Sequence, residues 1–396
     1  MTKKTVRQMD VSGKRVLVRV DFNVPQDPET GAILDDSRIR ASLPTLRLLL
    51  DRGASLVLCS HLGRPKGKVD AKLKLAPVAR RLSELISQPV PVSRGIVGDG
   101  VLSQARALGP GDILFLENLR FDPREEANDS EFAASLAALA DIFVNDAFGA
   151  AHRAHASTEG VVHHLPSVAG LLMDRELQYL GMASENPARP LAVLLGGAKI
   201  SDKIAVVRRL MEKLDVLLVG GGMCATFFKA MGYEIGRSIY EEDRLEFVSG
   251  IVAQGEQGSV TVTLPSDVVV AREFDANAPA EILPAGSVPT EAFILDVGPE
   301  TVSLFRDYIT RAKTVFWNGP MGVYEFPAFS RGTRGMAQAL AESEAVTVVG
   351  GGSTADAVAA FGLADRMDHV STGGGASLEF LGGSVLPGVA ALMDAP

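Results

Sequence analysis

Polar and basic side chains follow the ends of several apolar runs in the first half of the chain. They are Asp21, Asn23, His61, Arg64, Arg120 and, slightly downstream of its run, Arg153. Arg38 lies in the segment 35–40, which we interpret as a loop before the first helix. Arginine guanidinium groups match phosphate and carboxylate oxygens in a bidentate fashion. A single arginine at a strand end is equally well explained by a surface ion pair, but several with few acids beside them favour a small polyanionic ligand.

Residues 191–210 predict a second anion site. An apolar run is followed by two glycines and then by Ser201 and Asp202, which are residue types that begin helices. A strand, a glycine turn and a helix N-terminus together expose backbone N–H groups that can meet a phosphate. Lys199 and Lys203 are four residues apart, so in a helical first turn they would lie on one face and reach the same anion.

Further glycine turns end strand-like runs at 220–222, 319–322 and 350–352, and another lies at 373–375. Two of them fit the GxGxxA dinucleotide pattern, but neither is followed by the confirming acidic residue about 20 positions on. The chain has no GxxxxGK[ST] loop. Dehydrogenase and P-loop readings are therefore not favoured.

Metal and thiol chemistry are also not favoured. His152 and His155 lack the Cys or carboxylate spacing that would accompany them in a zinc site. Cys59 and Cys224 lie far apart in apolar surroundings that are typical of buried, reduced thiols.

The composition is that of a globular protein, with 46% hydrophobic and 22% charged residues among 396. No apolar run has transmembrane length, and the N-terminus lacks the apolar core of a signal peptide, so we expect a cytoplasmic protein. Residues 1–185 carry equal numbers of basic and acidic side chains, so the formal net charge of −9 falls on the remainder. Neither half resembles the basic face of a nucleic-acid-binding protein.

Strand-like and helix-like runs alternate along the chain, which predicts parallel sheets with crossover helices. The predicted strands are 15–20, 55–59, 113–116, 142–144, 191–195, 216–219, 260–264, 268–271, 315–317 and 346–349. The predicted helices include 42–51, 76–86, 130–140 and 171–184, and 279–289 is predicted to be a loop. Because the helix at 171–184 falls where the charge balance changes, we interpret it as the connection between two lobes.

Nine motifs make the chain resemble the phosphoglycerate kinase family over nearly its full length. They are RVDFNVP (19–25), SHLGRP (60–65), LENLRF (116–121), NDAFGAAHRAHAS (145–157), LGGAKISDKI (195–204), GGGM (220–223), GYEIG (232–236), WNGPMGVYEF (317–326) and STGGGAS (371–377). The resemblance implies reversible phosphoryl transfer from 1,3-bisphosphoglycerate to ADP, giving 3-phosphoglycerate and ATP, with Mg²⁺, as in glycolysis.

The same resemblance implies a monomer of two Rossmann-like α/β/α lobes joined by a long helix and a hinge. It implies a 3-phosphoglycerate-binding domain at 1–168, an interdomain helix at 169–185 and a nucleotide-binding domain at 186–385. The segment 386–396 is expected to pack back on the first domain.

Site roles are likewise carried over from the family. The glycerate ligand would contact Asp21, Asn23, Arg38, His61, Arg64, Arg120 and Arg153. The transferred phosphoryl group would be stabilised by Arg38, Lys199, Lys203, Gly352 and Gly375. The nucleotide would contact Gly197, Ala198, Lys203, Asn318, Glu325, Gly351, Gly352, Ser353 and Thr354.

Two positions and one short segment depart from the family pattern. Ser353 stands where the family has an Asp that contacts the metal, so the Ser353 or Thr354 hydroxyl, or the nucleotide phosphates alone, would hold Mg²⁺. Ile294 replaces a small residue near the adenine site, and Gly382–Ser384 lacks a usual carboxylate and ammonium group. A two-lobed phosphate sensor without catalysis is the alternative, although a sensor has no need for lysines on the second lobe.

Overall fold

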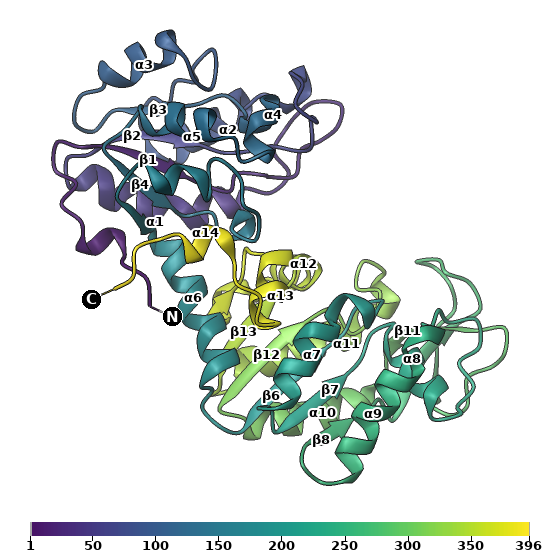
Figure 1. Cartoon of the computed structure of the whole chain (residues 1–396). Helices are drawn as coiled ribbons and strands as arrows, with labels where there is room; N and C mark the ends of the chain where they lie inside the picture. Colours follow the sequence, from purple (N-terminus) through teal and green to yellow (C-terminus); the bar gives the residue numbers. More distant parts are fainter. Residues whose placement is uncertain (1, 396) are drawn as a thin grey trace. The chain divides into compact units, whose positions relative to one another are not determined.

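The computed structural model describes residues 2–395 and divides the chain into two compact units (Figure 1). Unit 1 contains the chain up to Gln178 together with the segment that begins at Val385. Unit 2 is Tyr179–Ser384. Within residues 2–395, no helix combines the length and apolar character needed to span a membrane.

Unit 1 is built on a parallel five-stranded sheet. Its strands are β1 (Arg15–Arg19), β2 (Ser55–Cys59), β3 (Ile113–Phe115), β4 (Ile142–Asn145) and β5 (Ser167–Ala169), in the order β3-β2-β1-β4-β5. Every residue of β2 is buried, so both faces of the sheet are covered. This is why these strands read as continuous apolar runs rather than as alternating ones.

Helices connect and cover these strands. They are α1 (Ser37–Asp51), α2 (Ala76–Ile86), α3 (Asp99–Arg106), α4 (Pro123–Glu126), α5 (Ser130–Ala137) and the short α14 (Pro387–Ala390). The predicted loop at Arg38 is wrong, because α1 begins at Ser37 and places Arg38 in its first turn. Pro44 lies inside this helix, although proline is usually tolerated only in a first turn.

Two consecutive residues at the end of β4 form hydrogen bonds to the two segments through which the chain leaves unit 1 and returns to it. The Asn145 amide donates to the Gly388 carbonyl at 3.0 Å. The Asp146 carboxylate accepts from the Leu172 N–H at 2.9 Å at the start of α6 (Leu171–Glu185). The final segment is also fixed by the buried ammonium of Lys3, which lies 2.7 Å from the carboxylate of Asp394.

Unit 2 contains a parallel six-stranded sheet in the order β14-β13-β12-β6-β7-β8. Its strands are β6 (Leu191–Leu195), β7 (Val216–Val219), β8 (Thr261–Thr263), β12 (Thr314–Asn318), β13 (Val346–Gly350) and β14 (His369–Val370). Its helices are α7 (Ile204–Met211), α8 (Cys224–Ala230), α9 (Leu245–Glu256), α10 (Pro299–Arg311), α11 (Arg331–Glu342), α12 (Gly352–Ala360) and α13 (Gly375–Leu381). The predicted α/β class with two parallel sheets is therefore confirmed.

A smaller antiparallel sheet in unit 2 was not predicted. It consists of β9 (Asp267–Ala271), β10 (Glu281–Pro284) and β11 (Phe293–Val297), with β9 in the middle. The predicted loop at 279–289 is wrong, since β10 lies within it. Ile282 is exposed on this edge strand, so β10 shows neither an apolar run nor a clean alternation.

Candidate functional site

The carboxyl ends of three neighbouring strands in unit 1 bring together most of the predicted anion-binding residues. Asp21 follows β1, and its Oδ2 lies 2.6 Å from a guanidinium nitrogen of Arg38, which α1 places opposite it. Burial acts to raise the pKa of Asp21, but the charges of Arg38 and Arg19 and a hydrogen bond from the Asn23 backbone act against it, and the pKa is lowered. Asp21 is therefore ionised at neutral pH and orients Arg38.

Gly63 ties the loops after β1, β2 and β3 to one another. Its N–H donates to the Asn23 side-chain oxygen at 2.8 Å, and its carbonyl accepts from Arg120 at 2.8 Å. Its φ of +64° is the left-handed conformation that glycine adopts readily. Arg64 follows directly and its side chain is exposed, so sequence proximity and not a contact links it to the cluster.

His61 lies in the middle of these charges. Burial lowers its pKa well below the ordinary value, and the charges of Arg19, Arg120 and Arg38 add to this effect, whereas Asp21 opposes it. The imidazole is therefore neutral at physiological pH. A neutral ring keeps one N–H donor and one acceptor nitrogen.

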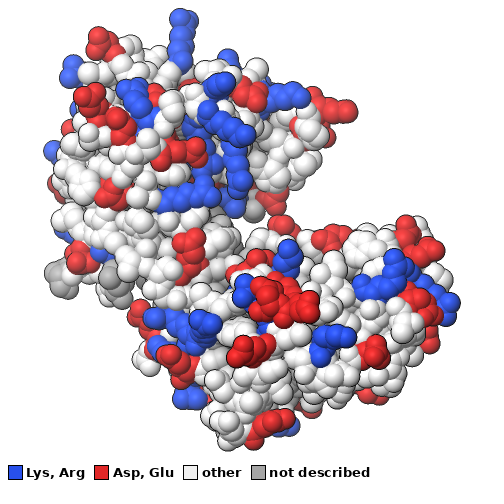
Figure 2. Space-filling view, turned by 45° about the vertical axis from the view of Figure 1, so that its right-hand side comes forward, with Lys and Arg blue, Asp and Glu red and all other residues white. Residues whose placement is uncertain are grey.

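The field at this edge of the sheet is net positive. Burial lowers the pKa of Arg120, and the charges of Arg19 and Arg153 lower it further against the opposing carboxylates of Glu126 and Asp21. The Arg153 Nε–H donates to His152 at 3.1 Å, which holds that arginine beside the others. A band of basic side chains is visible on this unit in Figure 2. Clustered, partly buried cations of this kind favour an anionic ligand.

Arg19 belongs to this cluster and was not predicted as a site residue. It is 1% exposed, although it ends a buried strand whose other members are mainly aliphatic. The sequence could have indicated Arg19, because it is a charged residue at the end of an apolar run, and buried arginines are rare unless they are paired.

In unit 2, the glycine turns after three adjacent strands pack backbone against backbone. A Cβ on Gly196, which follows β6, would lie 2.2 Å from the Pro320 carbonyl oxygen. A Cβ on Gly221, which follows β7, would lie 2.5 Å from the Gly197 nitrogen. Only glycine permits these approaches, so the sequence brings the ends of β6, β7 and β12 to one place.

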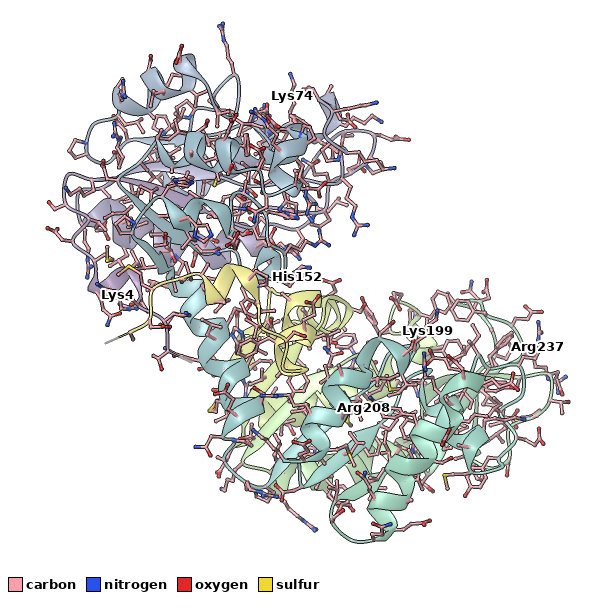
Figure 3. All side chains as sticks on the ribbon, in the orientation of Figure 1. Lys4, Lys74, His152, Lys199, Arg208 and Arg237 are labelled. Carbon is pink, nitrogen blue, oxygen red and sulfur yellow. The ribbon has the colours of Figure 1, made fainter. Side chains whose placement is uncertain are left out.

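The two predicted lysines differ in environment. Lys203 is buried, and burial lowers its pKa while nearby Asp202 acts in the opposite direction. Lys199 is exposed (Figure 3). The prediction that both lie on one face of a helical first turn is wrong, because Ser201–Lys203 forms a 3-10 turn and α7 starts only at Ile204.

Two backbone N–H groups near this turn are already bonded within the protein. One carboxylate oxygen of Glu241 accepts from the Ile200 N–H at 2.7 Å and from the Ser201 N–H at 3.2 Å. These two N–H groups are therefore not available to a phosphate, and Glu241 braces the turn instead. No local signal identified it, since it lies 41 residues from Ile200 along the chain.

The start of α12 retains free donor capacity. The side-chain nitrogen of Asn318 is buried and has no hydrogen-bond partner among residues 2–395. It lies 2.9 Å from where a Cβ on Gly351 would stand, and Gly351 has a φ of +87°. An unpaired buried amide beside a helix N-terminus favours an anionic group there.

The hydroxyl groups predicted to hold a metal are placed differently. Thr354 is buried, and its oxygen accepts from the Gly319 N–H at 2.7 Å, so it joins the turn after β12 to α12. Ser353 is exposed on the first turn of α12. Among residues 2–395, no group of three or more His, Cys, Asp or Glu side chains is arranged to hold a metal ion.

The remaining predicted positions lie in turns or at the start of a helix. Glu325 is exposed next to Tyr324, Gly375 is the first residue of α13, and Ala198 contacts the turn at Gly222. Ile294 is buried on β11, and its N–H donates to the Ser238 hydroxyl at 2.9 Å.

The segment 382–384 packs against Arg209. A Cβ on Gly383, whose φ is +87°, would lie 2.5 Å from the guanidinium of Arg209. The Nε of that arginine is buried and without a hydrogen-bond partner within residues 2–395.

Comparisons with known proteins agree with this geometry. The family model described as phosphoglycerate kinase matches residues 6–384. The chain is 54% identical to the phosphoglycerate kinase of Roseiflexus castenholzii and 52% identical to that of Microcystis aeruginosa, with both chains covered in full. Among solved structures, the phosphoglycerate kinase of Coxiella burnetii gives a TM-score of 0.87 at 41% identity, with 98% of each chain covered. That of Pyrococcus horikoshii gives 0.83 at 31% identity, covering 99% of this chain and 98% of the other. The protein therefore belongs to the phosphoglycerate kinase family.

Proposed function

We propose that unit 1 binds 3-phosphoglycerate or 1,3-bisphosphoglycerate and that unit 2 binds ADP or ATP. The observation that carries the first assignment is the net positive cluster around His61, in which Arg38 and Arg120 are held in place by protein contacts. Preorganised guanidinium groups bind the carboxylate and phosphate of such a ligand without first having to be ordered. The predicted ligand contacts Asn23, Arg64 and Arg153 extend this cluster.

The proposed reaction moves the acyl phosphate of 1,3-bisphosphoglycerate to the terminal phosphate of ADP, reversibly. The P–O bond between the phosphoryl group and the acyl oxygen breaks, leaving the carboxylate of 3-phosphoglycerate, and a new P–O bond forms to a β-phosphate oxygen of ADP. Enzymes of phosphoryl transfer act mainly by positioning and by neutralising charge on the transferred oxygens. We assign this role to Arg38, Lys199 and Lys203 and to the N–H groups at Gly352 and Gly375.

For the nucleotide, we assign the phosphates to the turns that end β6 and β13. Asn318 supports this assignment, because its buried unpaired nitrogen faces Gly351 at the start of α12. Gly197, Ala198 and Thr354 line or brace the same turns, and we assign the ribose to Glu325.

Mg²⁺ would enter as part of the nucleotide complex. This ion prefers oxygen ligands, usually keeps several waters, and is commonly bound through substrate phosphates. The Thr354 oxygen already accepts a backbone N–H, and Ser353 offers one exposed neutral hydroxyl. The residues therefore fit an ion held chiefly by phosphates and water, with Ser353 as the protein oxygen within reach. When bound, the ion neutralises phosphate charge.

A coupled assay that follows ATP consumption with 3-phosphoglycerate and Mg²⁺ tests the function directly. A protein that binds both ligands without turnover would instead be the non-catalytic sensor, which the comparisons do not favour. Arg38→Ala should lower kcat by about a hundredfold, as expected for loss of one preorganised charge contact. Arg40→Ala is the matched control, because Arg40 lies on the same helix but is exposed and paired with Asp36 at 2.8 Å.

The outcome separates binding from catalysis. Loss confined to KM, with kcat intact, would show that Arg38 only binds the ground-state substrate. A monomer in the cytoplasm is the expected form, and sedimentation velocity at micromolar concentration tests the assembly.

A further inference from the structure

A buried chain of hydrogen bonds runs behind the His61 ring. The Glu125 carboxylate accepts from the Ser157 hydroxyl at 2.5 Å and from the Ser157 N–H at 3.0 Å. The same hydroxyl oxygen accepts from Arg19 Nε at 3.0 Å. Another nitrogen of Arg19 lies 3.0 Å from His61 Nδ1. All four side chains are buried, so each of them is fixed by its partners.

The contact between Arg19 and His61 determines where the imidazole proton sits. A guanidinium group has only donors, so Nδ1 must act as the acceptor. The single proton of the neutral ring is then on Nε2. The position of this proton does not depend on the ligand, because a guanidinium group can only donate and lies 3.0 Å from Nδ1.

Asp21 offers the opposite arrangement. Its Oδ1 lies 3.6 Å from the same Nδ1 and is buried without a hydrogen-bond partner among residues 2–395. If Nδ1 carried a proton, that proton would point toward a carboxylate oxygen with unused capacity. Arg19 is the nearer partner, at 3.0 Å against 3.6 Å, so the structure favours the Nε2–H form. The balance rests on Arg19, since the contacts of His61 with Arg38 and Arg120 are coulombic only.

We propose that Arg19 is a positioning residue that fixes the His61 proton on Nε2, so that His61 presents a hydrogen-bond donor to its ligand. The role of His61 as a ligand contact rests on the proposed function, whereas the tautomer does not. In the other tautomer, Nε2 would present a lone pair, which repels the oxygens of an anion. Arg19 thus converts a residue that could accept or donate into one that only donates.

A purely structural role for Arg19 makes different predictions. In that case Arg19 would serve only to pair with Glu125 through Ser157, and the contact with His61 would be incidental. Its loss would then change stability but leave the His61 tautomer unchanged. The decisive readout is therefore spectroscopic.

The first experiment needs no variant. Long-range ¹H–¹⁵N correlation spectra of ¹⁵N-histidine-labelled enzyme at pH 7 distinguish the two tautomers, and the spectrum of His61→Gln identifies the His61 signals among the six histidines. An Nε2–H pattern in the wild type supports the proposal, and an Nδ1–H pattern overturns it. If the Nε2–H pattern is present but 3-phosphoglycerate leaves it unmoved, the proposed ligand contact fails and the role of Arg19 stands.

Variants then test the cause. Arg19→Met should move the proton toward Asp21, giving an Nδ1–H or doubly protonated ring, and should raise KM for 3-phosphoglycerate by about tenfold or more, as expected when a charge-assisted hydrogen bond is lost. Arg19→Lys retains a positively charged group that only donates hydrogen bonds, and it should restore part of the Nε2–H signal. Arg15→Lys is the control, because Arg15 lies on the same strand and pairs with Asp141 near the surface.

Ser157→Ala protects the test against a folding failure of Arg19→Met. It leaves the charge of Arg19 in place but removes the acceptor of its Nε–H. A mixture of tautomers in this variant supports the proposal. A His61 spectrum identical to the wild type in a folded Arg19→Met protein overturns it.

Discussion

Glu241 braces the turn that carries both proposed catalytic lysines, and its replacement offers a direct test of how unit 2 works. Its carboxylate holds the N–H groups of Ile200 and Ser201, and its own N–H donates to the Thr226 hydroxyl at 3.2 Å. Burial acts to raise the pKa of Glu241, but hydrogen bonds from the side chain and backbone of Ser201 and from the Ile200 backbone, with the charge of Lys199, outweigh it, so the pKa is lowered. The carboxylate is therefore ionised while the enzyme works.

The size of the effect follows from the two hydrogen bonds. A bond to a charged group contributes about 1.5–3 kcal/mol, but Glu241 is only half-buried, and solvent reduces this value. We take about 2 kcal/mol for the pair, which corresponds to about 30-fold in the population of the correctly formed turn. Glu241→Ala should therefore lower kcat by about 10- to 30-fold. Glu241→Gln keeps an acceptor oxygen and should stay within about threefold of the wild type.

Two measurements check this prediction together. Steady-state rates give kcat, and amide hydrogen exchange at Ile200 and Ser201 reports the turn itself. Glu242→Ala is the matched control, because Glu242 is the next residue and is exposed. Equal damage by Gln and Ala would show that the negative charge matters and the acceptor does not. Unchanged exchange in a Glu241→Ala enzyme with reduced kcat would refute the bracing mechanism.

Three further predictions concern backbone packing, pH and the metal. In urea unfolding, Gly196→Ala should destabilise unit 2 by several kcal/mol, since the added Cβ would lie 2.2 Å from the Pro320 carbonyl oxygen. Gly250→Ala in α9 is the control, because a Cβ there meets nothing within 4 Å, and it should stabilise the protein by about 0.5–1 kcal/mol. Burial raises the pKa of Asp296 from 3.8 to about 7, so the native state keeps a proton that the unfolded chain releases. The stability of unit 2 should consequently fall as pH rises from about 4 to 7 and level off above, and Asp296→Asn should remove most of this slope in unfolding curves. Ser353→Asp should tighten MgADP relative to free ADP by about tenfold in calorimetric titrations, and an unchanged ratio would place position 353 away from the metal.

The parallel strands could be predicted from the sequence because burial on both faces leaves a continuous apolar run. The predicted strand 55–59 has the bounds of β2, and 191–195 has those of β6. The start of α1 could not be found in the same way. A helix from 42 would place Pro44 in a first turn, where proline is normally found, but the helix begins at Ser37 and contains Pro44 in its interior.

The charges that lie at strand ends were also predictable, because parallel strands place their carboxyl ends at one edge. Residues that act through another side chain were not. Arg19 is the last residue of β1 and the first of the RVDFNVP motif, but nothing in that motif indicates its contact with His61. Glu241 lies 41 residues along the chain from Ile200 in the turn that it braces. Contacts of this kind, in which one residue positions another, depend on tertiary structure and cannot be predicted from spacing along the sequence.

The predicted helical geometry of Lys199 and Lys203 is wrong, but the environment of Lys203 still favours an anionic ligand. Lys199 and Lys203 are not aligned by helical spacing. Lys203 is nevertheless a buried cation whose charge is not fully compensated by nearby carboxylates, as is Arg120 in unit 1. In each case burial lowers the pKa of a cation, and the nearby carboxylates do not restore it. A buried cation with incomplete compensation costs stability, and a bound anion removes that cost. Both units therefore contain a buried cation that is incompletely compensated. Each unit is expected to be more stable with its own anionic ligand bound than without it. This is the electrostatic property expected of an enzyme that binds two phosphate-bearing substrates.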